Sequence, residues 1–207
     1  MKSNYYDKSV ELATEFQRNN PKNWAGNDSK NYHNQIRTLM DRYHAQTVLD
    51  YGCGKGEQYS TLNSYVLYFA PPGVRTEPMT FQTRINAESV YKFDPCVEEF
   101  NIEPVRQKFD AVICTQVLSS IPDADISWIK DKFMNYATKF VFIGMHSAIP
   151  KSKKRIYDNT HVNTHRTVDW YMEQFSNWSG PDLYWWFRYT ENSINDWYRT
   201  AIYKDNV

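Results

Sequence analysis

The chain has 207 residues and carries 24 basic and 24 acidic side chains, so its formal net charge is zero. This balance disfavours nucleic acid as the main partner, because a protein that binds a duplex needs a basic face to neutralise phosphates. Apolar residues make up 41% of the sequence, which is enough for the core of one domain. No apolar run approaches the roughly 18 residues of a membrane span, so a membrane is not an expected partner.

The cysteine content and the amino-terminal residues predict where the protein works. Cys53, Cys96 and Cys114 are too few and too unevenly spaced for a disulfide framework or a zinc site. Residues 1–6 lack the apolar core of a secretion signal. We therefore expect a reduced, cytoplasmic protein without a structural metal.

The first 44 residues predict two amphipathic helices. Apolar side chains recur at helical spacing over residues 9–17, and again over residues 31–43. The polar stretch 19–28 lies between these helices and is typical of a loop.

The next segment changes to the pattern of a buried strand. Residues 47–50 form a short β-branched run that ends in Asp50, and glycines follow at once, as expected of a parallel strand entering a turn. Residues 56–64 can continue as a helix. Residues 65–90 contain several prolines and are predicted to be an irregular insertion, with an extra strand expected around 66–69.

The second half alternates between strand and helix patterns. Asp123 is the expected amino-terminal cap of one helix, and Thr167 the cap of the next. The pattern predicts strands over 90–95, 108–114, 139–144, 183–189 and 197–203, with helices starting at 122 and at 167. Such alternation implies an α/β fold with a mostly parallel sheet and helices on both faces.

The run Asp50-Tyr51-Gly52-Cys53-Gly54-Lys55-Gly56 is the strongest functional signal. Glycines after a strand let the backbone turn sharply and approach a ligand, and the helix that follows is expected to present free N–H groups. Gly56 follows Lys55 where a phosphate-binding P-loop has Ser or Thr, which excludes that motif. The third glycine also comes one position too early for the dinucleotide-binding fingerprint.

Together with Val48 and Leu49, this run resembles motif I of the class I S-adenosylmethionine (SAM)-dependent methyltransferases. The resemblance implies a Rossmann-like α/β fold with a mostly parallel seven-stranded sheet and an antiparallel last strand. It implies one methyltransferase domain over residues 1–207, with amino-terminal helices in 1–44 and an insertion at about 65–90. SAM is then the expected cofactor.

The resemblance also implies a set of cofactor-binding residues. Asp50 would help to hold the amino group of SAM, and Asp94 would bind the ribose hydroxyls from the end of the second strand. The gap between these two acids is about twice the roughly 20 residues of a compact βαβ unit, which the insertion would explain. The alternative for Asp94 is a surface acid at a strand end. The full predicted set is Asp50, Tyr51, Gly52, Cys53, Gly54, Asp94, Pro95, Cys114, Thr115 and Gln116.

A second stretch strengthens the resemblance. Phe109-Asp110, an apolar strand and then Val117-Leu118 with Ile121-Pro122 resemble the fourth-strand region of the family. The segment between Pro95 and Lys108 is short, so the third strand of the family and its adenine-contacting acid are hard to place.

The methyl acceptor is expected to be a small molecule, with a sugar or a nucleotide-linked compound as candidates. A side-chain base would accept its proton, and His161 and His146 are the predicted catalytic residues because histidine titrates near neutral pH. His165, Tyr157 and Asp158 are further candidates. The basic run 151–155 is either a solvated loop or a site for a substrate phosphate.

Two other functions stay open at the level of sequence. One is a catalytically silent SAM-binding protein that acts through a protein partner. The other is a dinucleotide-dependent oxidoreductase, which the position of Gly56 disfavours.

Overall fold

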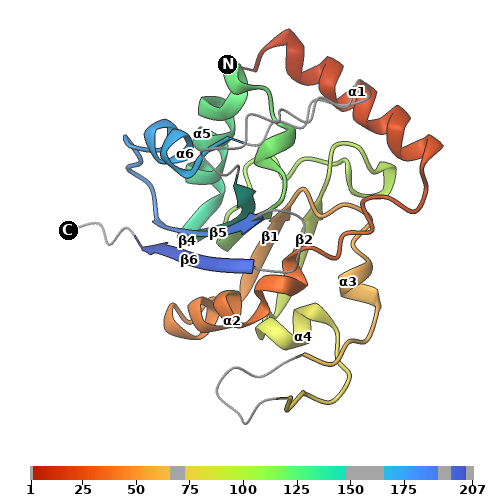
Figure 1. Ribbon diagram of the computed structural model, residues 1–207, viewed down its shortest axis with the longest axis vertical. Helices are drawn as coiled ribbons and strands as arrows, with labels where there is room; N and C mark the ends of the chain where they lie inside the picture. The colour runs from red at the N-terminus through yellow and green to blue at the C-terminus, as the bar shows by residue number, and fades with distance from the viewer. Residues whose placement is uncertain (1, 66–72, 148–165, 191–196, 204–207) are drawn as a thin grey trace.

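A computed structural model describes residues 2–65, 73–147, 166–190 and 197–203 (Figure 1). Its centre is a sheet with the strand order β2-β1-β3-β4-β5-β6. Neighbouring strands from β2 to β5 run parallel, and β6 pairs antiparallel with β5. The strands are β1 (Thr47–Tyr51), β2 (Ser89–Phe93), β3 (Phe109–Thr115), β4 (Ala137–Ser147), β5 (Asp182–Thr190) and β6 (Trp197–Tyr203).

The sequence expectation of seven strands is wrong for the described part of the chain, where the sheet has six strands. Between β2 and β3 the chain forms a short 3₁₀ helix, η2 (Glu98–Phe100), and no further strand. This connection is too short for a strand and its crossover, so the chain passes from β2 directly to the other side of β1.

Helices cover both faces of the sheet (Figure 1). α1 (Asn4–Asn19), α5 (Ile126–Tyr136) and α6 (Val168–Gln174) lie on one face, while α2 (His33–Arg42) and α4 (Phe81–Ile85) lie on the other. Each face has its own apolar cluster: Ile129 and Phe133 are fully buried on the α5 face, and Ile36 and Phe81 on the α2 face. The α/β architecture with two helical layers agrees with the sequence pattern.

Residues 73–90 contain a short helix, α4, that the sequence did not predict. Thr80 caps α4 by accepting a hydrogen bond from the Thr83 N–H at 3.3 Å, and Asn86 ends the helix in a left-handed conformation with φ 60°. Phe81 and Ile85 are fully buried against the sheet. The described part of this segment therefore contains the crossover between β1 and β2. The strand expected at 66–69 lies outside the described residues.

The two predicted helix caps have different outcomes. Thr167 caps α6 as expected, because its side chain accepts a hydrogen bond from the Trp170 N–H. The prediction for Asp123 is wrong: its carboxylate pairs with Arg166, and a 3₁₀ turn, η4 (Asp123–Asp125), precedes α5.

Strand order fixes where a ligand can bind. The chain leaves β1 for β2 on one side and returns to β3 on the other, so the connections after β1 and β3 diverge. In open parallel sheets such a switch point leaves a crevice at the carboxyl ends of the strands. No helix in the described ranges is both long and apolar enough to cross a membrane.

Candidate functional site

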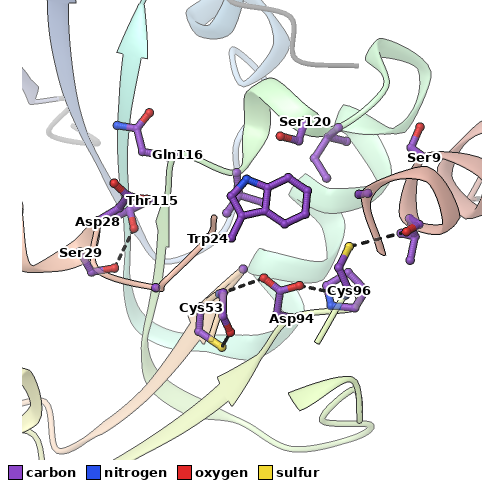
Figure 2. A pocket seen from close by; sticks show the side chains of 18 of the residues that line it. Ser9, Trp24, Asp28, Ser29, Cys53, Asp94, Cys96, Thr115, Gln116 and Ser120 are labelled. Carbon is purple, nitrogen blue, oxygen red and sulfur yellow. Dashed lines mark hydrogen bonds between the residues drawn. The ribbon is translucent and has the colours of Figure 1, made fainter. Parts of the chain in front are cut away.

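A pocket lies at this switch point (Figure 2). The empty space inside it is about 820 Å³, part of which is open to solvent. Seven of the ten predicted cofactor residues line it, contributed by the ends of β1, β2 and β3: Gly52, Cys53, Gly54, Asp94, Pro95, Thr115 and Gln116.

The other three predicted residues lie behind the pocket wall. Tyr51 packs in the core, with ring centroids 5.0 Å from Phe93 and 5.1 Å from Phe133. Cys114 is also fully buried in the core, and burial raises the pKa of its thiol. Asp50 is fully buried behind Gln58, a pocket-lining residue. Tyr51 and Cys114 therefore pack in the core beneath the site, and Asp50 lies behind its surface.

The glycine loop differs from expectation in one decisive respect, because its N–H groups are not free. The N–H groups of Gly52 and Cys53 both donate to the Phe93 carbonyl, at 2.7 and 3.1 Å. Every following N–H through Gln58 also has an acceptor inside the protein: the Asp94 carboxylate and then the carbonyls of Trp24, Cys53, Ala25 and Gly26. The loop therefore offers no cradle of backbone donors for a phosphate.

Close backbone packing explains why glycines are needed here. Gly54 has φ +56°, and a Cβ on it would lie 2.6 Å from the Trp24 carbonyl oxygen. Gly52 has φ +82°, and a Cβ there would lie 2.1 Å from a methyl group of Val117. Side chains at these positions would be strained by their backbone conformation and would collide with the pocket wall.

Asp94 is held by the backbone at the end of β2. One carboxylate oxygen accepts the Gly54 N–H at 2.9 Å, and the other accepts the Cys96 N–H at 2.9 Å. Burial raises the pKa of this carboxyl above its usual value, against the effect of the two hydrogen bonds. The side chain faces the pocket (Figure 2), so lone pairs on both oxygens can still accept hydrogen bonds from a ligand.

Asp50 is held by side chains from α3 (Glu57–Ser60). One carboxylate oxygen accepts hydrogen bonds from the Tyr59 hydroxyl at 2.6 Å and from the Gln58 amide at 3.1 Å. The other oxygen is buried and has no hydrogen-bond partner. Burial, with smaller contributions from the charges of Asp94 and Asp28, raises the pKa of Asp50 to about 7, against the effect of the two hydrogen bonds. A buried oxygen without a donor is uncommon in folded proteins and can accept a further hydrogen bond.

The amino-terminal segment forms the third wall of the pocket, which the sequence did not predict. α1 contributes Ser9, Val10 and Ala13, and the following loop contributes Trp24 and Gly26. The carbonyls of this loop accept the N–H groups of the glycine loop, so the two loops form one unit. In the sequence, only Trp24 and Gly26 within the mostly polar stretch 19–28 indicated that this loop packs against another part of the protein.

The end of β3 and the residues that follow it complete the pocket on its other side. Gln116 has the unusual φ of +61°, and its N–H donates to the Gly144 carbonyl at 2.8 Å. Its side-chain amide donates to the Tyr32 hydroxyl at 2.8 Å, and the hydroxyls of Ser29 and Thr115 lie 2.7 Å apart. Left-handed backbone at a residue other than glycine is often found at functional sites.

The predicted catalytic histidines fall where no side chain is described. His161 lies outside the described residues, as do His165, Tyr157, Asp158 and the basic run 151–155. The structure describes the backbone of His146 at the end of β4, where it pairs with Arg188, but not its side chain. Within the ranges that are described, no three His, Cys, Asp or Glu side chains are grouped so that they could hold a metal ion.

Comparison with known proteins adds no family assignment. No family model matches the sequence, and no curated protein matches it significantly. The geometry of the pocket is therefore the main indication of function.

Proposed function

We propose that this chain is a SAM-dependent methyltransferase of the class I, Rossmann-like type that methylates a small molecule. The observation that carries the proposal is a glycine loop without free N–H groups beside two carboxylates. Neither Asp50 nor Asp94 forms an ion pair with any lysine, arginine or histidine in the described ranges. Such a site suits a nucleoside that carries positive charge and no phosphate.

SAM fits these requirements, and a dinucleotide does not. The pyrophosphate of NAD needs unoccupied backbone donors at a helix start. Here those donors are occupied, and α3 has only four residues. A carboxylate with acceptor capacity on both oxygens suits the vicinal hydroxyls of a ribose, which is the role proposed for Asp94.

Asp50 is proposed to stabilise the ammonium group of SAM. One buried oxygen of Asp50 has no hydrogen-bond donor. A cation nearby, such as this ammonium group, would favour the charged form of the carboxyl. Gln58 lies between Asp50 and the pocket, so it can transmit this contact by hydrogen bonding.

When bound, SAM supplies a methyl group on a positively charged sulfur, and this group passes to a nucleophile as the carbon–sulfur bond breaks and its electron pair stays on sulfur. The pocket residues bind and orient the reactants, which accounts for much of the rate of such a displacement. The acceptor proton passes to a base, for which His161 and His146 remain the proposed residues. α1 covers one side of the pocket, which favours a small acceptor over a macromolecule.

Calorimetric titration tests this proposal with three ligands: SAM, its demethylated product S-adenosylhomocysteine (SAH), and NAD. We expect SAM and SAH to bind and NAD not to bind. Binding of NAD without SAM would overturn the proposal in favour of an oxidoreductase. Transfer of a labelled methyl group from SAM to compounds in a metabolite panel then separates an enzyme from a silent SAM-binding protein.

A further inference from the structure

Trp24 has an unusual backbone conformation for its residue type. Its φ is +51°, in the left-handed region that large side chains rarely adopt. Such a conformation costs about 1–2 kcal/mol and persists only where the surroundings impose it.

Contacts with the glycine loop impose this conformation. The Trp24 carbonyl accepts the Lys55 N–H at 3.0 Å, and the next carbonyl, that of Ala25, accepts the Glu57 N–H at 2.9 Å. Gly26 follows with φ +73°, and a Cβ there would lie 2.1 Å from the Cys53 carbonyl oxygen. The backbone on both sides of Trp24 is thus tied to the loop that begins the pocket.

The result is that the indole ring lies inside the pocket. Figure 2 shows it at the centre of the view, with Asp94 and Cys96 on one side and Ser120 on the other. Phe16 of α1 supports it, with ring centroids 5.7 Å apart. A partly buried indole beside a carboxylate that suits a ribose provides a flat apolar surface next to a sugar site.

We propose that Trp24 is a ligand-binding residue whose indole packs against the adenosine part of the bound ligand. This inference rests on the proposed function, because SAM supplies the adenosine. Base–aromatic stacking is tolerant of the base and contributes substantially to affinity in nucleic-acid sites. The backbone strain at Trp24 is then explained, since it directs the ring into the pocket.

Affinity measurements test this inference with SAH and free adenosine as probes. We expect Trp24→Ala to weaken both by about 10- to 100-fold, from the usual contribution of base–aromatic stacking. Trp24→Phe should retain most of the affinity, because a phenyl ring can also stack. The matched control is Trp178→Phe, since Trp178 donates to the Pro181 carbonyl and does not line the pocket.

Tryptophan fluorescence provides a second measurement that a purely structural role would not change. In the wild type and in Trp178→Phe, SAH should alter the emission, and in Trp24→Phe this change should be lost. If the wild type binds neither SAM nor SAH, the proposed function itself fails. If the wild type binds SAH but Trp24→Ala binds it equally well or more tightly, the role of Trp24 alone is overturned; tighter binding would mean that the indole blocks the site.

Discussion

The carboxyl ends of β1 and β2 each bring one aspartate to the same pocket, but the protein holds the two carboxylates differently. Asp94 receives one backbone N–H on each oxygen and lines the pocket. Asp50 receives only side-chain donors on one oxygen, and its other oxygen is buried without a partner. Asp94 is therefore fixed by backbone N–H groups, whereas Asp50 is a buried carboxyl whose ionised form is disfavoured by its surroundings.

The largest loss of ligand affinity is expected from Asp94→Ala. This variant tests the carboxylate that is held by backbone N–H groups. The substitution removes the proposed ribose acceptor and leaves the N–H groups of Gly54 and Cys96 without their acceptor. We expect SAH affinity to fall at least 100-fold and the free energy of unfolding to fall by about 1–3 kcal/mol. Calorimetry and thermal melting measure the two effects.

Asp110→Ala is the matched control for this variant. Asp110 also accepts two backbone N–H groups, those of Gln46 and Thr47, but it lies near the amino end of β3, away from the pocket. The Asp110→Ala variant should have a lower free energy of unfolding than the wild type and the same affinity for SAH. Equal affinity losses in both variants would mean that Asp94 acts through stability alone.

Asp50→Asn tests the other side of the comparison. The asparagine oxygen can still accept from Tyr59 and Gln58, but the negative charge is lost. We expect SAM affinity to fall about 10- to 50-fold, less than for Asp94→Ala, because Asp50 does not line the pocket. An affinity equal to that of the wild type would remove Asp50 from the proposed site.

The pKa of Asp50 predicts a pH dependence in the wild type. Since burial raises it to about 7, the carboxyl is largely neutral at pH 6 and largely ionised at pH 8. The affinity for SAM should rise about fivefold over this interval, because only the ionised carboxyl attracts an ammonium group and about half of the amino group of SAM is neutral at pH 8. Calorimetry at both pH values should show the rise in the wild type and a much smaller one in Asp50→Asn.

Stability without ligand should change in the opposite direction. The folded pKa of Asp50 lies above its unfolded value of 3.8, so the folded state binds the proton more tightly. This contribution to stability is complete below about pH 4 and is lost as the pH rises to about 7. Thermal melts from pH 5 to pH 8 should show a smaller loss for Asp50→Asn than for the wild type, by at most about 3 kcal/mol. Identical pH profiles would contradict a strongly perturbed Asp50.

The sequence predicted the parts of the site that follow strands. Parallel strands place their carboxyl ends at one edge of the sheet, and these strands have a strong apolar pattern. The sequence alone therefore predicted that Gly52, Asp94 and Thr115 lie close together, and all three line the pocket. The buried roles of Tyr51 and Cys114 depend on which face of the strand each side chain takes. That face is decided by tertiary packing, as Tyr51 shows against Phe133 of α5, and a short sequence motif does not encode it.

The third wall could not be predicted because its contacts are between backbones. The carbonyls of Trp24, Ala25 and Gly26 pair with the glycine loop, and a carbonyl has no sequence signature. The short helix α4 was missed for a related reason. Its five residues are too few for helical periodicity, and tertiary burial of Phe81 and Ile85 stabilises it.

The smallest effect on ligand affinity is expected from a substitution at the start of α1. This substitution tests the surroundings of Asp94 and leaves those of Asp50 unchanged. The Ser3 N–H and hydroxyl each donate to the buried Asp125 carboxylate at 2.6 Å, and the Ser3 hydroxyl also caps α1. Further along α1, Val10 reaches the pocket, and its carbonyl oxygen lies 3.8 Å from the sulfur of Cys96. Because Cys96 donates its N–H to Asp94, loosening α1 should disturb Asp94 more than Asp50.

Ser3→Ala should lower the free energy of unfolding by about 1–2 kcal/mol, since it removes a helix cap and a donor to a buried carboxylate. The affinity for SAH should fall only about twofold, because Tyr6 still docks α1 edge-on against Trp128, with ring centroids 4.9 Å apart. Lys2→Ala is the control, because its ion pair with Asp7 is exposed and should contribute little. A loss of affinity in Ser3→Ala as large as that in Asp94→Ala would mean that the position of α1, and not the backbone-held carboxylate, determines ligand binding on this side of the pocket.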